Sequence, residues 1–183
     1  TSGSPEAEHP IKWDRELDKY RTRGIEKHFA INAIVPSLYR PFCKKWFYFD
    51  RHFNGMVYKW ASIFPRRTDI NRLILYTQPG SQKPFMVGSS ETVCDLHFVG
   101  AAAGSECLPF SRYDDAGHRT ENITDWALDQ FKKHYQPGRT MRTRPITKEA
   151  IFHYVYGMLH DPIYREKYAQ NLKRESPRIP FYA

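Results

Sequence analysis

The sequence lacks the features that mark most membrane and secreted proteins. Its apolar runs are all shorter than the roughly 20 residues that a membrane-spanning helix needs, and no charged segment followed by an apolar one stands at its N-terminus. Neither a membrane partner nor secretion is therefore expected. It has only three cysteines, none with the spacing of a zinc knuckle or a redox motif. Reduced, structural cysteines and a cytoplasmic location are the expectation.

Motifs for nucleotide binding and catalysis are missing as well. The sequence has no glycine-rich phosphate loop, Gly-x-Ser-x-Gly elbow or His-Glu-x-x-His pair. A hydrolase triad of Ser90, Asp95 and His97 is conceivable, since Asp95 and His97 stand two apart on an expected strand and would share a face. The favoured interpretation is a structural, hydrogen-bonded His97, because such spacing recurs by chance. We therefore predict no catalytic residue, no metal and no cofactor.

Acidic residues are scarce in two parts of the chain and concentrated between them. Residues 36–72 hold eight basic and two acidic residues, and residues 131–183 hold eleven basic and four acidic ones. Residues 73–130 hold three basic and eight acidic ones, and the net charge of the whole chain is +8. Segregated positive charge favours a polyanion such as nucleic acid as the partner, although a soluble basic surface would have the same composition.

Aromatic residues are abundant, and they predict a folded domain. Twelve Tyr, twelve Phe and four Trp can bury a sizeable core. The expected fold class is α+β, with helices at the N-terminus, a mixed β region in the middle and a helical C-terminal third. Residues 1–7 are expected to be a tag or linker, and residues 8–183 one domain, mainly β over residues 39–121 and helical over residues 122–183.

Hydrophobic spacing, capping residues and glycine punctuation predict the individual elements. The expected helices cover residues 8–23, 56–64, 122–135 and 147–159, with a further one that begins at Asp161-Pro162 and carries Tyr164, Tyr168 and Leu172 on one face. The expected strands or extended segments cover residues 46–49, 72–77, 84–87, 95–99 and 107–110.

The most distinctive short string is Tyr39-Arg40-Pro41-Phe42. Pro41 fixes its own φ and favours an extended conformation for Arg40. The preferred interpretation is structural: Tyr39 and Phe42 pack on the core while Arg40 reaches a carboxylate or a backbone carbonyl. The alternative is contact between Arg40 and a phosphate group.

This string, followed by Trp46-Phe47-Tyr48-Phe49-Asp50, resembles the opening of the C-terminal specificity domain of Type ISP restriction–modification enzymes. Further strings that match this pattern, in the same order, lie at residues 95–100, 107–110, 122–128, 151–160, 164–169 and 177–181. Cys43 and the string Cys107-Leu108-Pro109-Phe110 depart from the family pattern, and we interpret both differences as changes in packing. The family's Asn-Pro-Pro-Tyr-type methyltransferase motif and its Walker motifs are absent, so the chain resembles the recognition part alone.

The resemblance implies a domain that reads duplex DNA and presents the target adenine to the methyltransferase domain of the same parent chain, beside a translocase. Lys and Arg would bind phosphates, and Arg, Asn, Gln or Lys would read base edges. Such readers must differ between enzymes with different targets, so we expect them between the family strings, in residues 50–82 and 111–121, with residues 136–144 as a backbone clamp. The candidates are Arg66, Arg67, Asn71, Arg72, Gln78, Gln82, Lys83, Arg112, Arg119, Arg139, Arg142 and Arg144.

A second hypothesis is a docking module that braces the methyltransferase and translocase domains without reading bases. Its docking face would be formed by Tyr154, Tyr156, Tyr164 and Tyr168. A concave cluster of basic side chains would favour DNA binding, whereas an exposed aromatic patch without nearby charge would favour docking.

Overall fold

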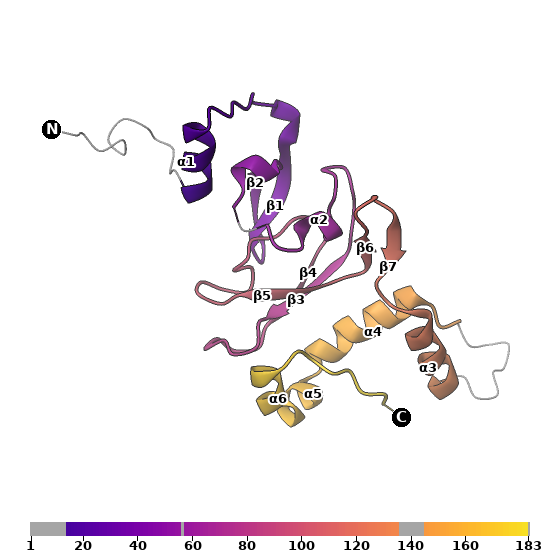
Figure 1. The fold of residues 1–183 in the computed structure, drawn as a ribbon. Helices are drawn as coiled ribbons and strands as arrows, with labels where there is room; N and C mark the ends of the chain where they lie inside the picture. The colour runs from indigo at the N-terminus through magenta and orange to yellow at the C-terminus, as the bar shows by residue number, and fades with distance from the viewer. Residues whose placement is uncertain (1–13, 56, 136–144, 183) are drawn as a thin grey trace.

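The computed structural model describes residues 14–55, 57–135 and 145–182, and its architecture is the predicted α+β class. A small central sheet separates an N-terminal part, rich in turns, from the C-terminal helices (Figure 1). Within the described ranges, no helix has the length and apolar character needed to cross a bilayer.

The central sheet is antiparallel and has the strand order β4-β3-β5. Its strands are β3 (Leu73–Thr77), β4 (Val87–Ser90) and β5 (Ser105–Pro109). All five residues of β3 are buried, because the strand is covered on both faces. Ile74 packs with the C-terminal helices, whereas Leu73 and Leu75 pack with Phe64 and Phe98 on the other face. The alternation of side chains along β3 therefore divides the core in two.

The helical third lies on one side of this sheet (Figure 1). It comprises α3 (Asp125–Tyr135), α4 (Lys148–His160), α5 (Pro162–Lys167) and α6 (Ala169–Arg174). The predicted caps are confirmed: the Thr147 hydroxyl accepts from the Ala150 N–H at 3.1 Å, and the Asp161 carboxylate accepts from the Tyr164 N–H at 3.0 Å. The expected last helix is two helices, because Tyr168 leaves helical geometry with a φ of −107° and a ψ of 19°.

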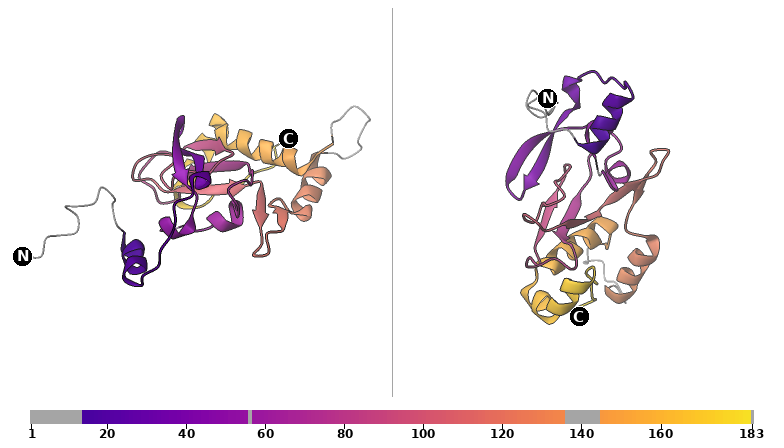
Figure 2. Two further views of the ribbon diagram at one scale, coloured as in Figure 1. Left: turned by 90° about the horizontal axis from the view of Figure 1, so that it is seen from above. Right: turned by 60° about the vertical axis from the view of Figure 1, so that its left-hand side comes forward.

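The N-terminal part lies on the other side of the sheet from α4, α5 and α6 (Figures 1 and 2). Its elements are α1 (Arg15–Thr22), η2 (Ile31–Ala33), β1 (Ile34–Arg40), β2 (Cys43–Tyr48), η3 (Arg51–Phe53) and α2 (Trp60–Ile63). The β1–β2 hairpin is tied to the core through the backbone of Leu38, whose N–H donates to Val93 and whose carbonyl accepts from Asp95. The hairpin is therefore held firmly at one edge.

Several expected elements differ in the structure. Residues 95–99 are a turn and not a strand, because the Phe98 and Gly100 N–H groups donate to the Asp95 and His97 carbonyls. The helix expected over residues 56–64 is reduced to α2, since Pro65 follows closely and Lys59 provides no capping side chain. Residues 84–86 bind the Thr77 side chain and backbone before β4 begins at Val87.

A further difference concerns the stretch after β5, where base-reading loops were expected. Residues 111–121 form a two-stranded hairpin of β6 (Ser111–Tyr113) and β7 (Arg119–Glu121). Its turn is built on Asp114, whose carboxylate accepts from the Ala116 and His118 N–H groups. The hairpin gives the exposed residues of this stretch a fixed direction.

Candidate nucleic-acid interface

The candidate residues that the structure describes lie at two opposite ends of β3, since Leu73 pairs with Pro109 just before the β6–β7 hairpin. One group precedes the strand or lies on the β6–β7 hairpin beside its first residues. The other follows the strand in the loop towards β4. Five residues of antiparallel strand span about 17 Å. The two groups therefore form separate surfaces, which we call the arginine end (Arg66, Arg67, Arg112 and Arg119) and the glutamine end (Gln78, Gln82 and Lys83).

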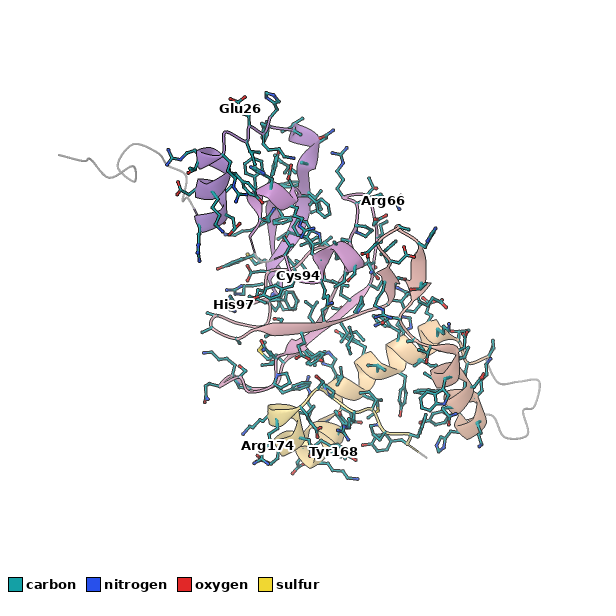
Figure 3. All side chains as sticks on the ribbon, in the orientation of Figure 1. Glu26, Arg66, Cys94, His97, Tyr168 and Arg174 are labelled. Carbon is teal, nitrogen blue, oxygen red and sulfur yellow. The ribbon has the colours of Figure 1, made fainter. Side chains whose placement is uncertain are left out.

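The first part of the arginine end is the turn that follows α2. Pro65 stops the helix, and Asp69 then binds both the backbone N–H of Arg66, at 2.9 Å, and its guanidinium, at 2.7 Å. The Asp69 side chain is only 7% exposed and that of Arg66 is 70% exposed. The hydrogen bond from Arg66 lowers the pKa of Asp69. Asp69 therefore anchors the turn, and leaves Arg66 and Arg67 at the surface (Figure 3).

The second part is the β6–β7 hairpin, which carries Arg112 and Arg119 as exposed residues. The Arg119 Nε donates to the hydroxyl of the fully buried Ser111 at 2.9 Å, so its guanidinium has a fixed base. The hairpin turn itself is acidic. The N–H and the side chain of His118 bind Asp114 and lower its pKa, which keeps a carboxylate at the tip. Phosphate contacts would thus fall on the strands of this hairpin and not on its tip.

Asn71 joins the two parts of the arginine end from inside. It is 2% exposed, and its amide N–H groups donate to the carbonyls of Ile63 and Ser111 at 3.0 and 2.7 Å. Its carbonyl oxygen accepts from the N–H groups of Arg72 and Ser111. All the capacity of the amide is used within the domain. This geometry favours a structural role for Asn71, which holds α2, β3 and β6 together.

Arg72 is also engaged inside the domain. Its guanidinium forms an ion pair with Glu149 of α4 and lies over the Phe110 ring, 4.4 Å from the ring centre. The Arg72 interaction lowers the pKa of Glu149. These contacts connect the sheet to α4, and they favour a structural role for Arg72 over base reading.

The glutamine end is a surface loop with backbone anchors on two sides. The Gln78 N–H donates to the Gly104 carbonyl at 2.9 Å, and the Gly80 N–H donates to the Lys173 carbonyl at 2.8 Å. Gln78, Gln82 and Lys83 are all exposed. This end therefore presents two amides and one ammonium on a supported loop. The remaining candidates, Arg139, Arg142 and Arg144, lie outside the described residues.

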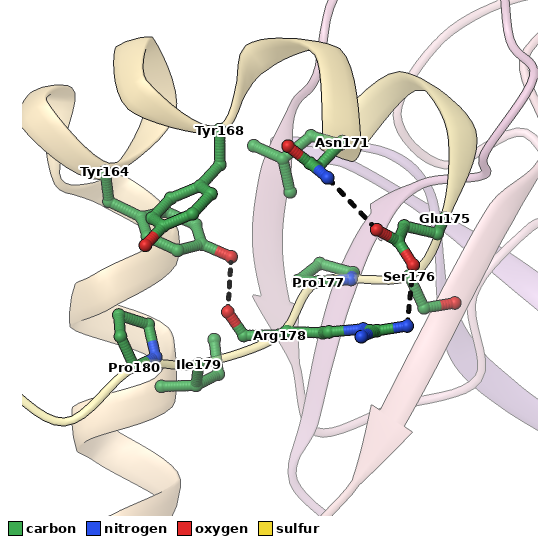
Figure 4. A pocket seen from close by; sticks show the side chains of 10 residues that line it. Tyr164, Tyr168, Asn171, Glu175, Ser176, Pro177, Arg178, Ile179 and Pro180 are labelled. Carbon is green, nitrogen blue, oxygen red and sulfur yellow. Dashed lines mark hydrogen bonds and ion pairs between the residues drawn. The ribbon is translucent and has the colours of Figure 1, made fainter.

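The aromatic face expected for docking is not exposed. Tyr164 is 1% exposed, and Tyr154, Tyr156 and Tyr168 pack against the same hydrophobic core. A cavity of about 240 Å³ between α6 and the extended C-terminal segment contains part of this group (Figure 4). The Tyr164 hydroxyl donates there to the Arg178 carbonyl at 3.0 Å. The Tyr154 hydroxyl likewise donates to the Pro180 carbonyl at 2.8 Å, so Tyr154 and Tyr164 hold the C-terminal segment on the helices. Tyr164 is therefore not available for docking, and the other three rings are only partly exposed.

Two further expectations about chemistry and packing have a clear outcome. His97 Nδ1 contacts the Ala103 carbonyl at 3.1 Å, and the Asp95 carboxylate accepts from Arg40 at 2.8 Å, so Ser90, His97 and Asp95 form no relay. The structural interpretations of His97 and Arg40 are confirmed. Tyr39 and Phe42 are the opposite case: the sequence predicts both on the core, but Tyr39 is 39% exposed and Phe42 is fully exposed.

The cysteines have the character of packed residues. Cys43, Cys94 and Cys107 are unpaired in the structure. Burial raises the pKa of Cys94 to about 11 and that of Cys107 to about 12, so both are neutral thiols near neutral pH. In the part of the chain that the structure describes, no group of three or more potential ligands could hold a metal ion.

The fold presents two separate polar ends on one small α+β domain, and comparison with known proteins gives its family. The family model of the Type ISP C-terminal specificity domain matches residues 3–183. The chain therefore belongs to the family of Type ISP C-terminal specificity domains, as the sequence resemblance implied. No curated protein matches it.

Three solved structures contain a similar domain. In a cryo-EM structure of a DrdV–DNA complex, the match covers 96% of this chain with 41% identity and a TM-score of 0.84. A nuclease-deletion mutant of the Type ISP enzyme LlaGI, in complex with a DNA substrate mimic, matches 92% of the chain at 32% identity and a TM-score of 0.69. The DNA-bound Type ISP enzyme LlaBIII shares the fold over 93% of the chain, at 23% identity and a TM-score of 0.74. The chain spans only 16%, 14% and 11% of those proteins, respectively.

Proposed function

We propose that this chain binds duplex DNA and selects the target sequence for a multidomain Type ISP restriction–modification enzyme. The observation that carries the proposal is the match to DrdV, which extends over nearly the whole chain and whose structure is a complex with DNA. The exposed guanidinium groups of the arginine end support it, because arginine binds phosphates and guanine edges in a bidentate manner.

The two ends of β3 suggest how the duplex would be read. They are about 17 Å apart, which corresponds to about five base pairs at 3.4 Å for each pair. The arginine end and the glutamine end would thus contact different base pairs of one target. Guanine suits the arginines and adenine suits Gln78 or Gln82, because these pairings are bidentate in the major groove.

The finer part of the proposal concerns the parent enzyme. A domain that fixes the register of the duplex would place one adenine in front of the neighbouring methyltransferase domain. The chain would supply binding and selection, and the chemistry would belong to the methyltransferase, translocase and nuclease parts. Exchange of this segment between two related full-length enzymes, followed by mapping of the methylated adenines, tests this part directly.

DNA binding by the 183-residue chain is tested by titration of a labelled duplex at several salt concentrations. If about four to six phosphates are contacted, the logarithm of the affinity should fall against the logarithm of the salt concentration with a slope of about −4 to −5. No binding at low salt, or an affinity that does not depend on salt, would contradict the proposal.

A pair of double variants tests the arginine end. Arg67→Ala with Arg112→Ala should weaken binding and reduce the salt slope by about 2, if both side chains contact phosphates. Lys167→Ala with Arg174→Ala removes the same charge from exposed residues of α5 and α6, far from Arg66 (Figure 3). Equal losses in the two variants would indicate a general charge effect and not a binding surface.

A further inference from the structure

An exposed aromatic side chain lies at the turn of the β1–β2 hairpin. Phe42 has a φ of +66° and a fully exposed side chain. With Pro41 before it, Phe42 occupies the third position of a tight turn, where glycine or asparagine is usual because other residues are strained at positive φ. Strained residues that persist in a fold are concentrated at binding and catalytic sites.

The hairpin that carries this ring is well supported below its tip. Arg40 pairs with Cys43 across the turn, and its guanidinium donates to the Asp95 carboxylate at 2.8 Å. On one face, Phe47 packs on Trp60 with ring centres 5.0 Å apart. The ring of Phe42 therefore extends from a rigid arm that is anchored to the core.

The surroundings of the ring are cationic and aromatic. Lys44 and Lys45 are exposed, and the Lys45 ammonium lies over the Tyr39 ring at 4.6 Å from its centre. Trp46 is 77% exposed, and the alternation of β2 places it on the face of Lys44, opposite to Phe47. Residues 34–49 contain no acidic residue. An exposed ring flanked by cations, on a hairpin whose nearby Asp95 carboxylate is paired with Arg40, complements a polyanion whose bases can stack.

We infer that the hairpin tip is a further DNA contact, in which the Phe42 ring inserts at a base step and Lys44 and Lys45 bind the flanking phosphates. The inference rests on the proposed function and adds a contact outside both ends of β3. An inserted apolar ring partly unstacks the bases and kinks the duplex, so the energetic cost falls when a base is already missing or mispaired. Phe42 should therefore favour a damaged step.

The test compares two labelled duplexes of about three helical turns that are identical except for one central abasic position. The wild-type chain should bind the abasic duplex about tenfold more tightly than the intact one, and Phe42→Ala should remove this preference by weakening binding to the abasic duplex about tenfold. Phe42→Trp should retain the preference, because it keeps a ring that can stack. Trp126→Ala removes another exposed ring, which is 72% exposed, from α3 and should change neither affinity nor preference.

Salt dependence separates the ring from its neighbours. Phe42→Ala should leave the salt slope unchanged, whereas Lys44→Ala with Lys45→Ala should reduce it by about 2. If the wild type binds duplex DNA and Phe42→Ala binds each of the two duplexes as tightly as the wild type does, the inference is overturned. If the wild type binds neither duplex, the proposed function itself fails.

Discussion

The tip region of the β1–β2 hairpin and the helices α4 and α5 both contain several aromatic residues, which are exposed in the first region and buried in the second. In the helical third, Phe152 and Tyr164 are 8% and 1% exposed and pack around Ile74 of the sheet. In the hairpin, Phe42 and Trp46 face solvent. Aromatic content therefore predicts burial only where a second apolar surface is available to cover the ring.

The polar groups differ between the two regions in the same way as the aromatic rings: they are bonded inside the domain in one region and lie at the surface in the other. The Tyr164 hydroxyl is satisfied by a backbone carbonyl within the domain, as a buried phenol requires. At the hairpin the cations lie over Tyr39, with Arg40 at 4.1 Å and Lys45 at 4.6 Å from the ring centre, and they remain in contact with water. The helical third is thus organised for stability, and the hairpin presents charge and rings outward.

The largest expected effect comes from replacing a phenylalanine by alanine, once in each of the two regions. Phe152→Ala should lower the free energy of unfolding by about 3–4 kcal/mol, because it leaves a cavity beside Phe110, whose ring centre lies 5.3 Å away. Phe42→Ala should change it by less than about 0.5 kcal/mol. Urea denaturation followed by circular dichroism measures both. Similar losses in the two variants would show that the hairpin ring is buried in solution.

A smaller effect is expected at the start of the central sheet, which lies between the two regions. Asn71→Ala should lower the free energy of unfolding by about 2–3 kcal/mol, because the buried N–H of Ser111 and two carbonyls lose their partner. Gln82→Ala, at an exposed position, should have an effect within about 0.5 kcal/mol. An Asn71→Ala variant with unchanged stability and weaker DNA binding would instead identify Asn71 as a base reader.

The smallest expected effect on stability concerns the backbone of the hairpin at Phe42. Phe42→Gly should raise the free energy of unfolding by roughly 0.5 kcal/mol, since the relief of positive φ slightly exceeds the entropy that glycine adds to the unfolded chain. Trp46→Gly, in the middle of β2, should lower it by about 1 kcal/mol. Thermal denaturation of the two variants measures the difference. A destabilised Phe42→Gly would mean that the ring makes contacts within the domain.

Much of the helical third could be predicted because its signals are local. Thr147 and Asp161-Pro162 mark helix starts by capping geometry, and the spacing from Ile151 to Leu159 marks a buried face. The turn at residues 95–99 has the sequence pattern of a strand. Its apolar residues, such as Phe98, are buried by packing in the core and do not pair with a neighbouring strand. Local pattern has no information on which surface covers a residue.

Sequence alone was enough to predict the α+β class, the family and the positions of α3 and α4, since these depend on composition, periodicity and caps that act over a few residues. Only the tertiary structure decided which polar candidates remain available. It buried Asn71 between α2 and β6, paired Arg72 with Glu149, and separated the arginine end from the glutamine end by the length of β3. It also left Phe42 without a covering surface. These outcomes depend on contacts between residues far apart in the chain, which no short-range pattern encodes.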